Sequence, residues 1–412
     1  MKKKIWFVSP YSMPPQYEMR IKTQMYSQIL QNKGYETLIF SSSVLHNLNV
    51  DLMENIKEDY IIRKYEGNSF VHIKTKKYSG NGIKRIFNMI QFSLKFKRIS
   101  RKFLKPDVII ADVNCINYGP IYRFSKKNNI RFIIDVRDLW PMSIVEYYKY
   151  TDKNLIIKYL YAREKKMYKR ADTIIFSMPG YEQYLKDKKW TNSIDLNKCY
   201  YINNGVDIKE FQYNINHFTY DNPIYNEDNI FKVVYTGSVR EANNIKSLVD
   251  AFKFIKDEFR DIKLFIFGSG DHQHELEKYC SQNGITNVHF MGFVEKKYIP
   301  SVLKQSNLNV LIYKNAKTLK YGGSQNKLFE YLAAKNPVLV TIDMNYSIIN
   351  EKVGVSIKSP EPKLIYKAIT SVYNKRTSTQ YNNHDFEEII KNFDFEVLTN
   401  KLIEILEEKL ND

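Results

Sequence analysis

The sequence YGGSQNKLFEYLAAKNP, residues 321–337, places two glycines directly before an apolar–polar segment of helical length. A helix that begins near Ser324 presents unpaired backbone N–H groups at the positive end of its dipole, and such an end suits a diphosphate. Lys327 and Glu330 are three residues apart and share a helical face, where the lysine can neutralise phosphate and the glutamate can bind a ribose diol. A glycine turn followed by a helix with an ordinary ion pair fits the same residues. The stretch alone leaves both interpretations open.

Short apolar runs alternate with helical-length segments on both sides of this stretch, which is typical of βα units around parallel sheets. The expected strands are 5–8, 36–41, 69–73, 108–111, 131–136, 173–177 and 199–202, then 231–236, 263–267, 288–291, 308–312, 337–341 and 354–357. We therefore expect an α/β protein of two Rossmann-like domains. The carboxyl ends of their strands should face each other across a cleft, where parallel sheets bind ligands.

The domain boundaries follow from the turn residues NNGVD, 203–207, and from a polar segment without clear periodicity at 208–229. We expect a first domain over 1–205, a linker over 206–230 and a second domain over 231–390. The last residues, 391–412, should form a helix that can cross back to the first domain.

Composition excludes several classes of protein. At 412 residues the chain is too long for one ordinary core. Its three cysteines, Cys115, Cys199 and Cys280, are far apart, so we expect neither disulfides nor a thiolate metal site, and a cytoplasmic location. No apolar stretch approaches the roughly 18 residues of a membrane span.

The segment 82–105 contains eight basic residues and no acid, and its apolar residues recur mostly at helical spacing. A basic amphipathic helix of this kind can lie on an anionic membrane surface. A helix with one face on the core and the other in water fits equally well. The net charge of +18 attracts polyanions, but no recognition motif indicates nucleic acid.

Six motifs in order resemble those of retaining glycosyltransferase family 4, and within it the bacterial polysaccharide branch that includes fucosamine transferases. They are the stretch 321–337, the turn 203–207, TGSVR at 236–240 with Lys246, FGSG at 267–270 with Glu275 and NVHFMGF at 287–293, DVRDLWP at 135–141, and NFDFE at 392–396. The resemblance covers the chain from Ser9 to about Leu406 and implies the GT-B fold.

The resemblance also implies a nucleotide-sugar donor, with UDP as the usual carrier, held by the second domain. The implied donor-binding residues are Gly237, Arg240, Lys246, Gly322, Gly323, Ser324, Asn326, Lys327 and Glu330. Arg240 and Lys246 should contact the phosphates, and Glu330 the ribose; with Asp138 these are the expected catalytic residues. Most of the family has a glutamate where this chain has Gly322, which leaves open how the donor sugar's hydroxyls are recognised.

We expect no metal cofactor. Cationic side chains and a helix N-terminus can stabilise a leaving diphosphate, the sequence has no Asp-x-Asp element, and His272 and His274 lack a convincing third ligand.

For the acceptor, Asp138 ends an expected strand and could take the acceptor's proton, with Arg137 setting its pKa. A charge cluster of Asp135, Arg137 and Asp138 that braces the loop is the alternative. Arg20 matches a position common in the branch and could meet an acceptor phosphate. The expected acceptor is a polyprenyl-diphosphate-linked sugar or an oligosaccharide at the inner membrane surface, in capsule, O-antigen or exopolysaccharide synthesis, and the expected donor sugar is an N-acetylated amino sugar.

Two other functions share this architecture. A nucleotide-sugar 2-epimerase needs carboxylates around the sugar, which Gly322 disfavours. A catalytically inactive GT-B partner subunit is disfavoured by Arg240, Lys246, Lys327 and Glu330. No residue indicates the oligomeric state.

Overall fold

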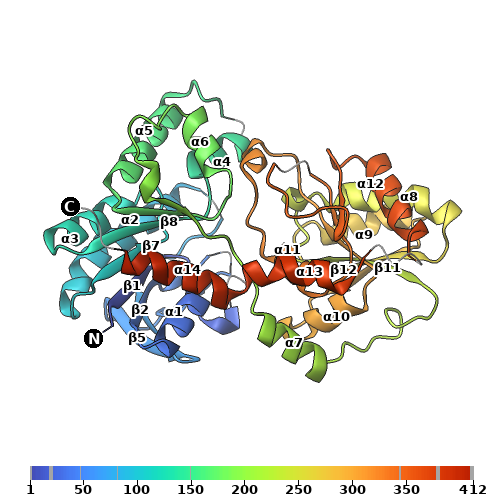
Figure 1. Ribbon diagram of the computed structural model, residues 1–412, viewed down its shortest axis with the longest axis horizontal. Coiled ribbons are helices and arrows are strands. Elements are labelled where there is room, and N and C mark those ends of the chain that lie inside the picture. Colours follow the sequence, from blue (N-terminus) through green and yellow to red (C-terminus); the bar gives the residue numbers. More distant parts are fainter. Residues whose placement is uncertain are drawn as a thin grey trace. The chain divides into compact units, whose positions relative to one another are not determined.

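The computed structural model describes residues 2–17, 22–46, 48–80, 82–148, 150–342, 345–376 and 381–408. The chain divides into two compact units, Met1–Asn203 with Leu398–Asp412, and Asn204–Val397. Each unit is built on a mainly parallel sheet flanked by helices (Figure 1), which confirms the expected α/β class and its two Rossmann-like units.

The first unit contains a sheet of eight strands in the order β10-β9-β8-β7-β1-β2-β6-β5. The strands are β1 (Lys4–Val8), β2 (Glu36–Ser42), β5 (Tyr60–Tyr65), β6 (Asn68–Ile73), β7 (Val108–Ala111), β8 (Arg131–Val136), β9 (Thr173–Phe176) and β10 (Cys199–Tyr201). All neighbouring pairs are parallel except β5 with β6, and a separate antiparallel pair joins β3 (Val44–Leu45) to β4 (Val50–Asp51). Because β1 lies between β2 and β7, the direction of strand addition reverses there.

Helices cover this sheet on both faces. They are α1 (Lys22–Asn32), α2 (Ile83–Ile99), α3 (Tyr118–Lys127), α4 (Trp140–Tyr147), α5 (Leu155–Arg170), α6 (Tyr181–Asp187) and the end of α14 (Phe395–Glu407). Trp6 of β1 packs between Phe124 of α3, at 6.0 Å between ring centroids, and Phe96 of α2, at 6.3 Å. Aromatic packing of this kind adds directional contacts to the burial of apolar area.

The last helix returns to the first unit, as the sequence suggested. The carboxylate of Glu407 accepts a hydrogen bond from Tyr35 at 2.8 Å and pairs with Lys3 at 3.1 Å. Figure 1 draws α14 in red beside the blue strands β1 and β2. The chain therefore begins and ends in one unit.

The otherwise apolar core around α5 contains a buried acid. Glu164 of α5 is 2% exposed and accepts hydrogen bonds from the hydroxyls of Tyr168 at 2.8 Å and Tyr184 at 2.7 Å. Burial raises the pKa of the Glu164 carboxyl to about 7, although the two hydroxyls favour its charged form.

The second unit contains six parallel strands in the order β13-β12-β11-β14-β15-β16. They are β11 (Phe231–Thr236), β12 (Ile262–Phe267), β13 (Val288–Gly292), β14 (Leu308–Leu311), β15 (Val338–Val340) and β16 (Gly354–Ser356). The helices are α7 (Ile208–His217), α8 (Ile245–Glu258), α9 (Gln273–Gln282), α10 (Ile299–Gln305), α11 (Asn326–Ala333), α12 (Pro362–Asn374) and α13 (Asn383–Ile390).

Alternate residues of the central strands fill two separate cores in this unit. Val233 and Tyr235 pack with α8, α9 and α12, while Val234 packs with α7, α10, α11 and α13. Successive side chains of a strand point to opposite faces, so a strand that is apolar throughout must be covered on both sides.

Two expectations differ from the structure. Residues 208–217, expected to be irregular, form α7, because Asp207 caps its first turn by accepting a hydrogen bond from the Glu210 amide at 2.8 Å and Phe211 packs into the core. The strand β5 was not expected, since as an edge strand with no buried residue it lacks a clear apolar pattern.

No helix among the described residues is long and apolar enough to cross a membrane. The three cysteines are buried free thiols.

Candidate active site

The second unit has its topological switch point at β11, which lies between β12 and β14. Open α/β sheets bind ligands outside the carboxyl ends of the strands at such a point. Gly237 follows β11 there, and Tyr313 follows β14 after one residue.

The amine of Lys327, on the first turn of α11, occupies this position. Its Nζ lies 3.1 Å from the hydroxyl of Tyr235, 4.3 Å from that ring's centroid and 5.5 Å from the ring of Tyr313. The Tyr235 hydroxyl donates to the carbonyl of Ser238 at 3.0 Å, so it accepts from the lysine. Within the described residues, no carboxylate comes within the 4.0 Å of an ion pair with Lys327.

Burial lowers the pKa of Lys327 to about 7, and the charge of Glu330 opposes this. Burial raises the pKa of the Glu330 carboxyl, while Lys296 and Lys327 oppose the rise. Both groups are thus partly enclosed and lie one turn apart on one helix face, as the sequence predicted.

Both the backbone conformation of Gly237 and its contact with Lys327 favour glycine at this position. Its φ is +128°, a conformation that side chains rarely adopt, and a Cβ there would lie 2.6 Å from the Lys327 Nζ. Gly237 therefore allows the amine to approach the loop after β11.

Two glycines and a hydrogen bond from Asn204 shape the loop before α11. Gly322 has a φ of +86°, and a Cβ on Gly323 would lie 2.2 Å from the Oε1 of Gln325. The side chain of Asn204 donates to the carbonyl of Ser324 at 2.5 Å, which ties the turn 203–207 to this loop.

The side chain of the N-cap residue does not cap the N-terminus of α11. Gln325 occupies the N-cap position without capping the helix with its side chain, and its Oε1 is buried without a hydrogen-bond partner. Asn326 is the first residue of α11. Backbone N–H groups at such an end, together with the helix dipole, favour an anion.

The two other expected phosphate ligands lie differently. Arg240 is exposed at the start of the turn Glu241–Asn243. Lys246 is also exposed, pairs with Asp250 at 2.8 Å and lies 4.0 Å over the ring of Tyr279 on α9. Its ammonium is thus engaged along α8 and α9, and Lys327 is the cation that the fold brings to Gly237.

The first unit has a charge cluster at its own switch point, between β1 and β7. Asp112, directly after β7, accepts a hydrogen bond from Ser9 at 2.8 Å and pairs with Arg137 at 3.2 Å. Arg137 also pairs with Asp135 at 3.1 Å, and Lys22 pairs with Asp135 at 3.2 Å.

Lys22 is deeply enclosed in this cluster. It is 3% exposed, and besides Asp135 it donates to the Ser177 hydroxyl at 3.0 Å and the Ile202 carbonyl at 3.2 Å. Burial lowers the pKa of Lys22 although Asp135 opposes it. Burial also opposes ionisation of Asp135, but Lys22 and Arg137 outweigh it and lower the pKa of that carboxyl.

The expected cluster of Asp135, Arg137 and Asp138 is correct only for its first two members. Arg137 takes Asp112 as its second carboxylate, because the end of β7 lies beside the end of β8. Asp138 is exposed. Arg20 lies outside the described residues.

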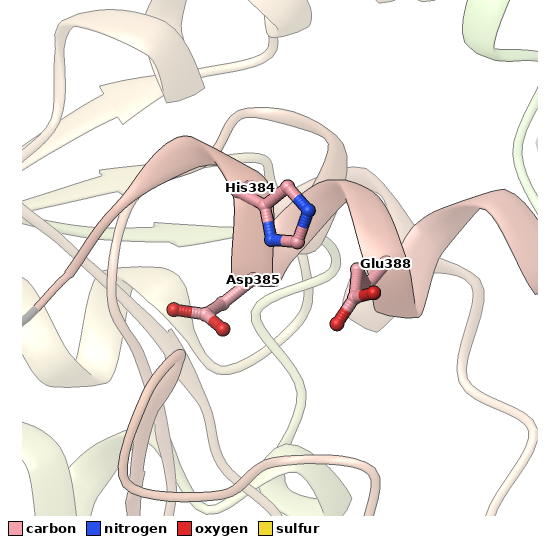
Figure 2. A group of neighbouring side chains, drawn as sticks. All are labelled: His384, Asp385 and Glu388. Atoms are coloured by element: carbon pink, nitrogen blue, oxygen red, sulfur yellow. The ribbon is translucent and has the colours of Figure 1, made fainter.

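The described residues hold one group with the spacing of metal ligands, His384, Asp385 and Glu388, all on α13 (Figure 2). Their ligand atoms lie within 4.8 Å of one another. Asp385 already pairs with Lys352 at 3.3 Å, and His384 and Glu388 are exposed. The arrangement fits a capped helix start as well as an ion site.

Both units match known protein families in sequence. Residues 230–375 match the family described as "Glycosyl transferases group 1", and residues 30–210 match "Glycosyltransferase Family 4". The chain thus matches glycosyltransferase families in both units and has the GT-B fold. A relative in Methanocaldococcus jannaschii, described as an uncharacterized glycosyltransferase, is 24% identical over 271 residues. That match covers 62% of this chain and 60% of the relative's length.

Solved structures show the same fold over the whole glycosyltransferase chain. Sucrose-phosphate synthase from Thermosynechococcus elongatus is similar with a TM-score of 0.74, 14% identity and 98% of each chain covered. The Anabaena protein HepE, solved in complex with UDP and glucose, has a TM-score of 0.67 at 14% identity, with 99% of this chain and 100% of HepE covered. An E. coli structure titled trehalose-6-phosphate, bound with UDP-2-fluoro glucose, has a TM-score of 0.72 at 10% identity, with 98% of this chain and 99% of the E. coli chain covered.

Sequence reasoning missed several residues of the glycosyltransferase's two switch points. They are Lys22, Asp112, Tyr235, Tyr313 and Gln325. Asp112 follows an expected strand directly, and Tyr235 lies near the end of another, so the ends of strands were the available signal. Lys22 gave no such signal, because the fold joins it to a strand more than a hundred residues away.

Proposed function

We propose that this chain transfers a sugar, with retention of configuration, from a uridine diphosphate donor bound at the switch point of the second unit. The observation that carries the proposal is the placement of Lys327 against Gly237, one turn before Glu330 on the same helix. Lys327 and the N-terminus of α11 would hold the diphosphate, and Glu330 would accept hydrogen bonds from the ribose.

The role of the protein in such a transfer is electrostatic. The bond between the anomeric carbon and the diphosphate oxygen breaks while the acceptor hydroxyl arrives on the same face. Preorganised cations and N–H dipoles stabilise the charge that develops on the leaving diphosphate. We propose that Lys327 and the backbone after Ser324 supply that stabilisation, and that Arg240 in the loop after β11 adds to it.

Known structures of this fold support uridine as the nucleoside, since both HepE and the E. coli protein were solved with uridine nucleotides. We further propose an N-acetylated amino sugar as the donor sugar and a polyprenyl-linked or oligosaccharide acceptor in surface polysaccharide synthesis. Asp138 and Arg137, at the end of β8, are the residues we propose for the acceptor side.

A thermal-shift screen of the full chain against UDP, GDP, ADP and CMP tests the donor site, because a ligand that binds the folded state raises the melting temperature. We expect UDP to give the largest shift and Glu330→Ala to abolish it. Glu404→Gln, at an exposed position of α14, should respond like the wild type. A chain that responds to none of these nucleotides contradicts the proposal.

A membrane role rests on α2. Its inner face, including Phe92 and Phe96, is buried, while Ile83, Phe87 and Leu94 on the opposite side are 71%, 66% and 53% exposed. One face of α2 therefore packs on the core, and the other presents an apolar stripe to solvent, which supports the membrane interpretation as a proposal.

The basic residues near this stripe differ in whether they form ion pairs within the protein. Lys95 and Arg98 pair with Asp59 at 3.0 and 2.7 Å, so they are partly neutralised. Arg101 is exposed, and each lysine or arginine close to an anionic bilayer contributes about 1 kcal/mol of attraction. We propose that the stripe and the exposed Arg101 dock the cytoplasmic enzyme on an anionic membrane.

Sedimentation with vesicles of phosphatidylglycerol and phosphatidylethanolamine checks this proposal. We expect the triple variant Ile83→Ser, Phe87→Ser, Leu94→Ser to lose most binding. Ile62→Ser removes an apolar side chain that is 56% exposed on β5 and should keep it. Equal binding of the triple variant and the wild type would rule out α2 as the docking helix.

A further inference from the structure

Among the residues that the structure describes, no carboxylate pairs with the amine of Lys327, and such pairing is what usually keeps a buried lysine charged. It faces the rings of Tyr235 on β11 and Tyr313 after β14, and it donates a hydrogen bond to the neutral hydroxyl of Tyr235. On its own helix, Glu330 acts on it only through space. Aromatic faces attract a cation weakly compared with the water that burial removes.

The side of the amine toward the loop is shaped for a ligand. Gly237 leaves the space that any side chain would fill at 2.6 Å from the Nζ. Lysine carries three N–H donors when charged, and Tyr235 accepts one of them. The remaining donors suit the oxygens of a diphosphate that lies at the carboxyl end of β11 and at the start of α11.

We propose that the donor diphosphate binds together with one proton, which Lys327 takes up from solvent as the ligand arrives. The inference rests on the proposed function, because it concerns the charge of the same site. It makes Lys327 a switched cation, neutral in much of the free enzyme and charged in the complex.

The sign of the linkage follows from the direction of the shift. Burial in the free protein lowers the pKa of Lys327 to about 7, and a diphosphate beside the amine raises it again. Above pH 7 the free state therefore holds fewer protons than the complex, so affinity falls as pH rises. The loss approaches about tenfold per pH unit until the pKa of the complex is reached.

The other groups around the amine titrate elsewhere or in a distinguishable way. Burial raises the pKa of both Tyr235 and Tyr331, so these hydroxyls keep their protons across the range of interest. The remaining neighbours are Tyr313 and Glu330, of which Glu330 has a raised pKa. A variant of Lys327 that cannot titrate separates the lysine from the glutamate.

Isothermal titration calorimetry of the full chain with UDP at pH 8.5 tests the proposal. Repeating the titration in phosphate, HEPES and Tris, whose ionisation enthalpies differ, gives the number of protons taken up per UDP. We expect about one for the wild type, because an amine with a pKa near 7 is almost wholly neutral at this pH. The affinity should fall at least fivefold between pH 7.5 and 8.5.

Matched variants locate the proton. Lys327→Arg carries a permanent charge and should bind UDP with less than about 0.2 proton taken up. Lys327→Met should bind at least tenfold more weakly, and Lys367→Met, at an exposed position of α12, should resemble the wild type.

The outcomes separate the two proposals. No UDP binding by the wild type contradicts the proposed function itself. UDP binding without proton uptake leaves that function standing and refutes the inference, and so does proton uptake that persists in Lys327→Arg.

Discussion

Replacing Gly237 by alanine tests the link between the loop after β11 and Lys327. The new Cβ would lie 2.6 Å from the Lys327 Nζ and 3.2 Å from its Cε, so the amine must move. The φ of +128° adds backbone strain of about 1–3 kcal/mol for a residue with a side chain. A charge-assisted hydrogen bond contributes about 1.5–3 kcal/mol, so losing it should weaken UDP binding roughly 10- to 100-fold.

Gly67→Ala is the control that separates the effect of backbone strain from the effect of displacing Lys327. Gly67 has a φ of +84°, and a Cβ there would meet nothing within 4 Å. Both variants should unfold at lower denaturant concentration, but only Gly237→Ala should bind UDP more weakly by calorimetry. If Gly237→Ala binds UDP as tightly as the wild type, Lys327 is not positioned by Gly237 and the geometry of the proposed site is wrong.

Asp135→Asn should lower the free energy of unfolding by about 3–5 kcal/mol, since it leaves Lys22 buried without its carboxylate. Lys22→Met should lower it less. If denaturant titrations give the reverse order, the pairing of Lys22 with Asp135 is not what stabilises this cluster. For Glu164, the folded-state pKa of about 7 exceeds the unfolded value of 4.5, so the wild type should lose about 2.4 kcal/mol of stability between pH 5 and pH 7.5 and then level off. Glu164→Gln should flatten that profile, and an unchanged slope would show that the carboxyl does not titrate there. Gln325→Ala should weaken binding of UDP-sugars while leaving UDP itself unaffected, because its buried Oε1 has no hydrogen-bond partner among the residues that the structure describes; equal effects on both ligands would exclude contact with the sugar.

The strands that sequence predicted best are those buried on both faces. Residues 131–136 and 231–236 form β8 and β11 with the expected bounds, because each is a short and mostly apolar run of strand length. In contrast, β5 has charged and apolar residues without alternation and lies at the edge of its sheet, where pairing with β6 rather than a local pattern determines its conformation.

Helix α11 and the loop before it were predictable because their signal is local. The spacing of Lys327 and Glu330 and the glycines before them fall within one turn and one loop. The first unit's cluster was not, since Lys22, Asp112 and Asp135 come from three separate elements that only the sheet order brings together. For Lys246 the sequence already offered a local partner, because Asp250 is four residues on and the two form an i,i+4 ion pair; its contact with the donor phosphates stays a prediction.

The central claim is that the second unit holds a uridine diphosphate sugar for transfer, and release of UDP tests it most directly. Without an acceptor, water takes the acceptor's place slowly, so a panel of UDP-sugars, including N-acetylated amino sugars, should show enzyme-dependent UDP release from at least one member. The account predicts that Lys327→Met and Glu330→Ala reduce this rate at least tenfold and that Glu404→Gln leaves it unchanged. UDP release that is absent for every donor, or equal in all variants, would contradict the account.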